Sequence, residues 1–196
     1  MFVTFEGLDG SGKTTQARLL AEHLNGEGRE VVLTREPGGT PLAERVREVL
    51  LHGEDVSAWA EAALFAAARA ELVTRVIRPA LEGGKDVVCD RYIDSSLAYQ
   101  GIARGLGVDS VLDLNLAVVD GLLPDRTFVL LVDPAAAAER SNAARDRIER
   151  EGEEFHATLD RAYRELAERF ADRIVALDGS APPQDVYARV REKLPS

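Results

Sequence analysis

The hydrophobic residues of this chain gather in five short runs that are rich in β-branched and aromatic side chains. These runs predict strands at residues 2–6, 30–34, 86–89, 127–132 and 173–177. The fourth run, TFVLLV, is almost continuously apolar, which is typical of a strand buried on both faces of a parallel sheet.

Between these runs, apolar residues recur with the 3.6-residue period of a helix. Helices are predicted at 15–24, 42–51, 57–81, from Asp94 or Ser95 to just before Gly101, at 108–122, from 133 onward, at 154–170 and at 185–194. Pro79 predicts a kink near the end of the third helix. The apolar surplus of 108–122 fits a subunit interface and burial within the same chain equally well.

Strands that alternate with helices predict an α/β fold. We expect residues 1–196 to form a single three-layer P-loop domain, with a five-stranded parallel sheet and helices on both faces. Ligands of such sheets bind beyond the carboxyl ends of the strands. A glycine-rich loop, Arg35, the pair Asp90 and Arg91, and Asp133 all follow predicted strand ends. These positions should therefore converge on one rim.

The glycine-rich loop reads GLDGSGKT and satisfies G-x-x-x-x-G-K-[ST], the phosphate-binding P-loop pattern. Its glycines let successive N–H groups close around an anion, and the helix that follows adds its positive end. The Lys13 ammonium can approach the β- and γ-phosphates, and the Thr14 hydroxyl can ligate Mg²⁺. A glycine-rich turn without a ligand is the alternative. The predicted nucleotide-binding residues are Gly7, Leu8, Asp9, Gly10, Ser11, Gly12, Lys13 and Thr14.

Composition excludes several other classes of protein. The formal net charge of −10 argues against nucleic acid as the main partner, whereas a nucleotide needs only a local cationic pocket. Cys89 is the single cysteine, so no intrachain disulfide can form. No apolar run approaches the roughly 20 residues that span a bilayer, and a strand rather than a signal peptide follows Met1. We expect a cytoplasmic protein that does not bind membranes.

A P-loop alone fits kinases, GTPases, motors and transport ATPases. The chain is short for a motor, and it lacks the N-K-x-D motif that reads guanine. A charge-dense insertion at about 141–153 separates two predicted helices and is rich in arginine. It resembles the mobile lid of a nucleoside monophosphate kinase.

The motifs EGLDGSGKTTQ, TREPGGT, FAAAR, DRYIDSSLAYQG and DRIE together resemble bacterial thymidylate kinases. The likeness runs through nearly the whole chain with the motifs in the same order. It implies ATP-dependent phosphorylation of dTMP in dTTP biosynthesis, with ATP as phosphate donor and Mg²⁺ as cofactor. It also implies a homodimer.

The resemblance assigns roles to the acceptor site. Phe65 and Arg69 lie four residues apart on one helix face, and they are expected to stack on thymine and to reach its O4. Ser96 and Gln100 fall where the family reads the pyrimidine edge, and Tyr99 where it crowds the 2′ position of the sugar. Without the resemblance, a Phe on a helix would be interpreted as core packing.

Further roles fall at the strand ends. Asp9 is expected to contact the sugar 3′-hydroxyl, and Arg91 to hold the dTMP phosphate. Arg35 and Glu36 belong to the loop that lines the monophosphate site, where Arg35 contacts the phosphate or holds Glu36. Asp90 ends a buried strand and is expected to approach Mg²⁺, directly or through water. Ion pairing and loop stabilisation are the structural alternatives for these residues.

The lid is expected to supply charge to the transferred phosphoryl group. Some family members place an arginine within the P-loop, where this chain has Gly10. Arg145 and Arg147 are the best candidates for that role, ahead of Arg140 and Arg150; a solvated charge run is the alternative. The predicted catalytic residues are therefore Lys13, Arg91, Arg145 and Arg147.

Two other functions stay open at this point. One is a P-loop kinase that acts on another nucleotide or nucleoside. The other is a regulatory nucleotide switch, against which the second, base-binding set of motifs argues.

Overall fold

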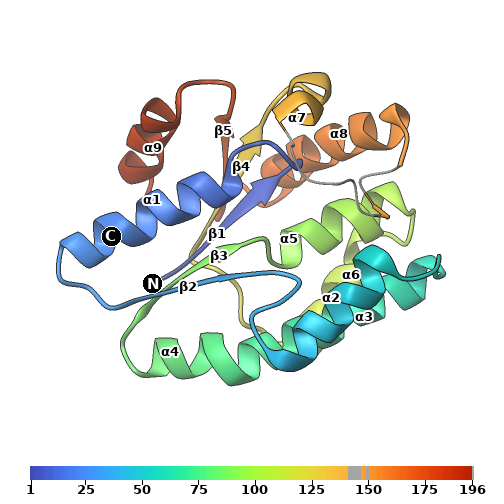
Figure 1. Ribbon diagram of the computed structural model, residues 1–196, viewed down its shortest axis with the longest axis horizontal. Coiled ribbons are helices and arrows are strands. Elements are labelled where there is room, and N and C mark those ends of the chain that lie inside the picture. The colour runs from blue at the N-terminus through green and yellow to red at the C-terminus, as the bar shows by residue number, and fades with distance from the viewer. Residues whose placement is uncertain (141–146, 149–150, 196) are drawn as a thin grey trace.

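Five parallel strands form the centre of the molecule (Figure 1). A computed structural model of the chain describes residues 1–140, 147–148 and 151–195. The strand order is β2-β3-β1-β4-β5, so the P-loop strand lies in the middle of the sheet. The strands are β1 (Phe2–Gly7), β2 (Val31–Arg35), β3 (Asp86–Asp90), β4 (Arg126–Leu131) and β5 (Ile174–Asp178). The predicted parallel α/β fold is confirmed.

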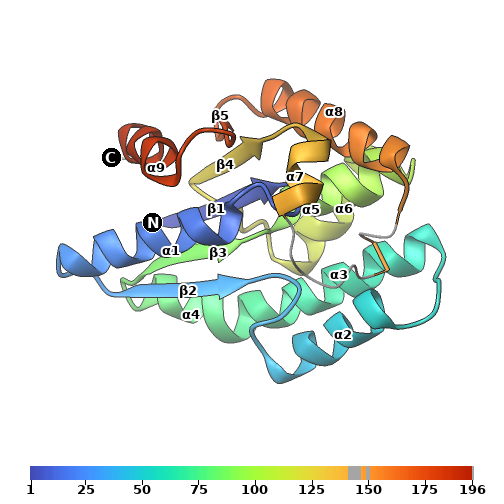
Figure 2. The ribbon, with the colours of Figure 1, turned by 45° about the horizontal axis from the view of Figure 1, so that its top comes forward.

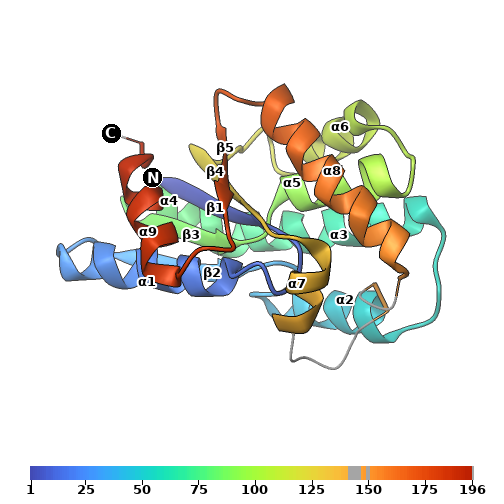
Figure 3. The ribbon, with the colours of Figure 1, turned by 90° about the horizontal axis from the view of Figure 1, so that it is seen from above.

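Helices cover both faces of this sheet (Figures 2 and 3). One face carries α1 and α9, which pack on each other, and the other carries α4, α5 and α8 with α3 and α6 outside them. The α-helices are α1 (Lys13–Gly26), α2 (Pro41–His52), α3 (Ala58–Leu72), α4 (Arg78–Glu82), α5 (Ile93–Ser96), α6 (Val108–Val118), α7 (Pro134–Arg140), α8 (Glu153–Arg169) and α9 (Pro183–Glu192).

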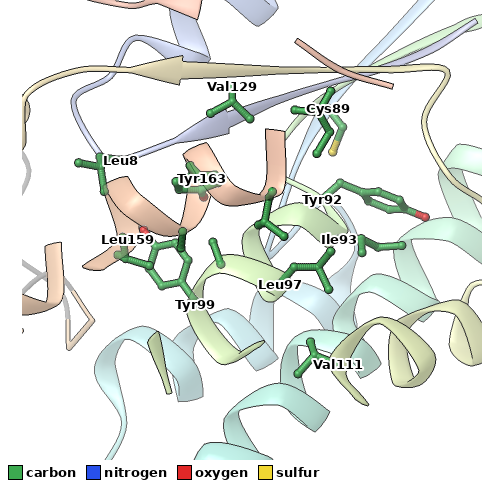
Figure 4. Packing of buried hydrophobic residues seen from close by; sticks show 14 of the residues in the cluster. Leu8, Cys89, Tyr92, Ile93, Leu97, Tyr99, Val111, Val129, Leu159 and Tyr163 are labelled. Atoms are coloured by element: carbon green, nitrogen blue, oxygen red, sulfur yellow. The ribbon is translucent and has the colours of Figure 1, made fainter. Parts of the chain in front are cut away.

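Alternate side chains of the strands enter two separate cores. Phe5, Phe128 and Leu130 pack under α1 and α9, whereas Cys89 and Val129 face the opposite side. Figure 4 shows the second core between the sheet and the helices beyond it. Because a strand residue and its neighbour point to opposite faces, central strands need apolar residues at almost every position. This explains the continuous apolar run in β4.

The long predicted helix at 57–81 is interrupted by a π-helical segment, η1 (Val73–Ile77). Pro79 has no N–H to donate to the carbonyl four residues before it, and its ring crowds that carbonyl. The wider turn of η1 accommodates this defect while the chain stays helical into α4.

The helix predicted to end before Gly101 continues beyond it. After α5, a second π-helical segment, η2 (Leu97–Ala103), passes through Gly101. A Cβ atom on Gly101 would lie 3.3 Å from the Cα of Val108, at the start of α6. The glycine therefore permits a close approach of two helices, and it does not end the first one.

A buried ion pair ties α5 to the sheet. The Asp94 carboxylate is fully buried and accepts hydrogen bonds from Arg173 Nη1 at 2.6 Å and Nη2 at 2.7 Å. Thr127 Oγ1 in β4 donates to the same carboxylate at 3.0 Å. This fork-to-fork geometry fixes the segment that follows β3, which carries several predicted site residues.

No helix in the described ranges is both long and apolar enough to cross a membrane.

Candidate active site

The P-loop connects β1 to α1 at the carboxyl edge of the sheet. Gly7 has φ 132°, and a Cβ atom there would lie 2.5 Å from the Leu130 carbonyl oxygen. Gly12 has φ 97° and immediately precedes α1. Both positions favour glycine, because a side chain would strain the backbone or collide with β4. The loop borders a cavity of about 780 Å³, here called the P-loop cleft.

Lys13 begins α1 and lies almost completely buried beneath the loop. Its Nζ donates to the Leu8 carbonyl oxygen at 2.8 Å and lies 3.4 Å from Asp9 Oδ1. Burial lowers the pKa of Lys13, and the Arg91 charge acts in the same direction, while nearby carboxylates oppose both. The ammonium group is thus held at the wall of the P-loop cleft.

Thr14 and Asp90 bring a hydroxyl and a carboxylate together beside Lys13. Thr14 Oγ1 donates to Asp90 Oδ2 at 2.5 Å. Among the described residues no cluster of three or more His, Cys, Asp or Glu side chains could hold a metal ion. A site with two protein oxygens suits Mg²⁺, which commonly keeps several waters and binds substrate phosphates. Ser11 Oγ in the same loop is buried without a hydrogen-bond partner in the described structure. This hydroxyl could donate to an oxygen of a bound phosphate group.

Arg91 adopts a left-handed backbone conformation, with φ 71°. Such a conformation is strained for a non-glycine residue and tends to occur at functional sites. Its Nη2 donates to Asp9 Oδ1 at 2.6 Å, and its Nη1 donates to Ser95 Oγ at 3.0 Å and Tyr163 Oη at 3.3 Å. Burial raises the pKa of Asp9, but Arg91 and Lys13 outweigh it and hold that pKa well below its usual range. Asp9 therefore stays ionised between two cations.

Glu6 lies beneath this group and is fully buried. Its carboxylate accepts hydrogen bonds from the Tyr92 amide at 2.7 Å and from Ser95 Oγ at 2.5 Å. Burial and the nearby Asp94 carboxylate raise the pKa of Glu6 from 4.5 to about 7, against the opposing effect of Arg91. Glu6 supports the backbone and side chains that hold Arg91 in place.

We expect Glu6→Gln to change the pH dependence of stability. Because the pKa of Glu6 is higher in the folded state, that state binds the extra proton between pH 4.5 and about 7. The free energy of unfolding of the native chain should therefore fall, relative to that of Glu6→Gln, by about 2 kcal/mol between pH 5 and pH 7. Denaturant unfolding at several pH values measures this difference. Glu22→Gln, on the exposed face of α1, is the control and should show no such difference from the native chain. If the stability of Glu6→Gln changed with pH in the same way as that of the native chain, the assigned pKa would be wrong.

A second, smaller cavity adjoins the P-loop cleft, here called the side pocket. Phe65 of α3 and Tyr99 of η2 supply aromatic walls, and Ser96 and Gln100 supply polar groups. Asp9, Glu36, Arg47 and Arg91 line both cavities. The structure thus brings most of the predicted acceptor residues together beside the P-loop.

Arg69 is placed differently from what the sequence suggests. Its side chain is 1% exposed and lies behind the side pocket. Nε donates to Glu36 Oε2 at 2.8 Å, Nη1 to Ser96 Oγ at 3.0 Å and to Asn115 Oδ1, and Nη2 to the Tyr92 carbonyl oxygen at 3.0 Å. In this arrangement the guanidinium supports the residues that line the pocket.

The neighbouring residues Glu36 and Arg35 differ in burial. Glu36 is buried, and burial raises its pKa in spite of Arg69. Its Oε1 is buried without a hydrogen-bond partner in the described structure, although Glu36 lines both cavities. Arg35 is exposed and donates to the Pro37 carbonyl oxygen at 3.0 Å and to Glu44 Oε2 at 3.2 Å. Arg35 lines the P-loop cleft, and its guanidinium bonds to Pro37 and Glu44 rather than to Glu36.

The lid candidates fall in three different situations. Arg145 and Arg150 lie outside the described residues. Arg147 donates from Nη2 to Glu61 Oε2 at 2.7 Å and from Nε to the Leu50 carbonyl oxygen at 2.9 Å, beside the side pocket. Arg140 lines the P-loop cleft and donates to the Gly179 carbonyl oxygen at 3.1 Å.

The sequence assigned no specific role to several residues around the site. Arg47 lines both cavities and donates to the Pro37 carbonyl oxygen at 3.0 Å, yet it lies within a regular helix and gives no local signal. Glu6 is the first residue of the motif EGLDGSGKTTQ, but the motif assigns it no role. Asp133 follows its strand as expected, and its Oδ1 accepts from the amides of Ala135 and Ala136, so it caps α7.

Comparisons with known proteins agree with this geometry. The thymidylate kinase family model matches residues 5–190. A thymidylate kinase of Symbiobacterium thermophilum is 47% identical over 194 residues, which cover 97% of this chain and 91% of that protein. One of Leifsonia xyli is 48% identical over 198 residues, covering 99% and 94%.

A solved structure agrees as well. The crystal structure of thymidylate kinase from Ehrlichia chaffeensis matches with a TM-score of 0.81 and 36% identity, and the match covers 98% of this chain and 97% of that one. With a P-loop, a second pocket beside it and these relatives over almost its full length, the chain belongs to the thymidylate kinase family.

Proposed function

We propose that this chain transfers the terminal phosphoryl group of ATP to the 5′-phosphate of dTMP, giving ADP and dTDP. One observation carries the proposal: the P-loop cleft and the side pocket share Asp9, Glu36, Arg47 and Arg91. Two nucleotides bound in these cavities would meet phosphate to phosphate at the shared residues. We treat residues 1–196 as one catalytic domain.

ATP would bind in the P-loop cleft. The loop amides and the start of α1 would hold its phosphates, with Lys13 beside them. Gly7, Leu8, Asp9, Gly10, Ser11, Gly12, Lys13 and Thr14 form this binding segment. Thr14 and Asp90 would hold Mg²⁺, which, when bound, offsets the negative charge that the phosphates share.

dTMP would bind in the side pocket. Phe65 would lie against the base, and Ser96 and Gln100 would contact its polar edge. Tyr99 would limit the space beside the sugar, and Asp9 would accept from its 3′-hydroxyl. In the described arrangement, Arg69 would hold Ser96 in place beside the base. For Arg69 to donate to O4 of thymine, its bonds to Glu36 and Ser96 would have to rearrange.

The acceptor phosphate would lie against Arg91, with Arg35 and Glu36 at the edge of the same space. One anionic oxygen of dTMP attacks the terminal phosphorus of ATP as the bond from that phosphorus to the bridging oxygen breaks. The electron pair leaves with ADP, and no proton has to move. The protein therefore supplies positioning and positive charge rather than a strong base.

The lid arginines Arg145 and Arg147 are proposed to add positive charge at the transferred group. They would take the role of the P-loop arginine that some family members have at the position of Gly10. Arg147 would have to leave Glu61 and the Leu50 carbonyl to do so, and this requires a lid arrangement different from the one described. Lid closure would also exclude water, which limits wasteful hydrolysis of ATP.

We further propose a homodimer in the cytoplasm, without nucleic acid or a membrane as partner. Leu42 and Val49 of α2 are 46% and 48% exposed, and Trp59 of the adjacent α3 is 50% exposed. Large exposed apolar side chains on packed helices favour an interface there. The net charge of −10 disfavours nucleic acid.

Release of ADP from ATP, measured with and without dTMP, tests the proposed reaction. We expect strong dependence on dTMP, because the acceptor completes the site and the phosphoryl group needs a positioned oxygen. Parallel assays with dUMP, dCMP, AMP and GMP identify the acceptor base. ADP release that does not depend on dTMP would support a nucleotide switch, and a preference for another monophosphate would support a different P-loop kinase.

A further inference from the structure

Glu61, in the first turn of α3, lies behind the side pocket and is 1% exposed. Four hydrogen bonds converge on its carboxylate. Gln100 Nε2 donates to Oε1 at 2.9 Å, and Arg147 Nη2 donates to Oε2 at 2.7 Å. Arg104 donates from Nε to Oε1 at 3.3 Å and from Nη2 to Oε2 at 3.4 Å. None of the motifs that identify the family contains this residue.

The hydrogen-bond partners of Glu61 determine its charge. Burial raises its pKa, but the hydrogen bonds from Gln100 and Arg147 and the charge of Arg104 together bring it below its ordinary value. Arg104 is also held in place, since its guanidinium carbon lies 4.8 Å from the centre of the Phe155 ring. Glu61 is therefore a carboxylate that can only accept hydrogen bonds.

An acceptor at this point fixes the orientation of the Gln100 side-chain amide. The NH₂ end of Gln100 must face Glu61, because the carbonyl end would be repelled by the carboxylate. Gln100 also lines the side pocket, together with Phe65 and Ser96. Its Oε1 has no hydrogen-bond partner among the described residues. This oxygen is also not completely buried. The carbonyl oxygen is thus left to meet a ligand.

We infer that Glu61 is a positioning residue that presents the carbonyl oxygen of Gln100 to the acceptor base and so selects a pyrimidine with an N–H at ring position 3. This inference rests on the proposed function, because it takes the side pocket as the dTMP site. Glu61 itself does not line that pocket as described.

The chemistry of the pyrimidines explains the selection. Thymine has one ring N–H, at position 3, and an accepting carbonyl on each side of it. Cytosine has a lone pair at the same ring position, which would face the Gln100 oxygen. An unpaired, buried acceptor costs enough to change binding by about tenfold or more. If Gln100 were free to flip, its NH₂ group could donate to cytosine, and the preference would weaken.

Glu61→Gln tests the inference. The new amide can either donate or accept, so Gln100 can flip. We expect the KM for dTMP to rise about tenfold or more while kcat changes much less, and the ratio of kcat/KM for dTMP to that for dCMP to fall by about tenfold or more. Glu71→Gln is the matched control, because it makes the same change on the same helix, where Glu71 pairs with Arg75. That control should keep the native KM and the native ratio.

A swap of the pair keeps the test valid if Glu61→Gln folds poorly. The double variant Glu61→Gln with Gln100→Glu retains the pair, its volume and its charge. The carboxylate at position 100 would accept from the new amide and still present an oxygen to the base. The swap should therefore prefer dTMP over dCMP, which a merely structural role of Glu61 would not predict.

The outcomes separate this inference from the proposed function. If the native chain phosphorylates dTMP in preference to dCMP but Glu61→Gln keeps the native KM and preference, only the role of Glu61 is overturned. A swap without any preference for dTMP overturns it as well. If the native chain shows no dTMP-dependent release of ADP, the proposed function fails and this inference fails with it.

Discussion

Arg91→Ala should lower kcat for phosphorylation of dTMP by at least about 10²-fold. Arg91 is the cation at the boundary of the two cavities, and Ser95, Tyr163 and Asp9 hold its guanidinium in place. Two phosphate groups must approach each other at this boundary, and each carries negative charge. Removal of this fixed cation leaves part of that repulsion uncompensated.

The loss should exceed the simple removal of one charge. Asp9 is kept ionised by Arg91 and Lys13, so in Arg91→Ala its carboxylate faces the phosphates with one less neutralising partner. Arg91→Lys keeps a charge but loses the planar fork, and it should recover only part of the rate. Steady-state kinetics at saturating ATP and dTMP measure the effect. Arg164→Ala, which removes an exposed arginine that pairs with Asp160 on α8, is the matched control and should be near normal. Near-normal turnover of Arg91→Ala would contradict the proposed phosphate contact.

Lys13→Ala should likewise lower kcat by at least about 10²-fold. The effect should arise at the phosphates of ATP rather than at the phosphate of dTMP. Its ammonium lies at the P-loop wall, fixed by the Leu8 carbonyl at 2.8 Å. A water molecule that filled the space left by the side chain would carry no charge, so it could not neutralise the phosphates. The KM for ATP should also rise, since the ground-state phosphates contact the same group.

Lys85→Ala provides the control for this change, because Lys85 is a surface lysine paired with Glu30. It should leave both kcat and KM near their native values. Lys13→Met, which restores length without charge, should remain as impaired as Lys13→Ala. Recovery of turnover in Lys13→Met would show that packing, and not charge, is what Lys13 contributes.

Local signals predicted much of the fold. The five strands were predicted to within a residue or two, because each is a short apolar run bounded by polar or turn residues. The helices around Gly101 and Pro79 were less predictable. Gly101 resembles a helix end in sequence, but the contact with Val108 that explains it joins two elements. The π-helical turn at 73–77 depends on how the chain accommodates Pro79.

The candidate site divides in the same way. The P-loop and the segment after β3 are each recognised by a local sequence motif, so Lys13, Thr14, Asp90 and Arg91 could be found from the sequence. The structure places these four residues around one cleft. Arg47 and Glu61 could not, because each lies in a regular helix and acquires a role only from residues that the fold places beside it. Arg69 and Arg147 were recognised as important, but their partners were not.

The strands, the phosphate loop and the identity of the charged groups depend on neighbouring residues and short spacings, so they could be predicted without a structure. Which charges pair with each other became clear only from the packing of the folded chain. It turned Arg69 toward Glu36 and Asn115, docked Arg147 on Glu61 and buried Glu6 beside Asp94. Such pairings depend on how separate helices pack against the sheet, and in a buried setting the packing also decides which groups are ionised.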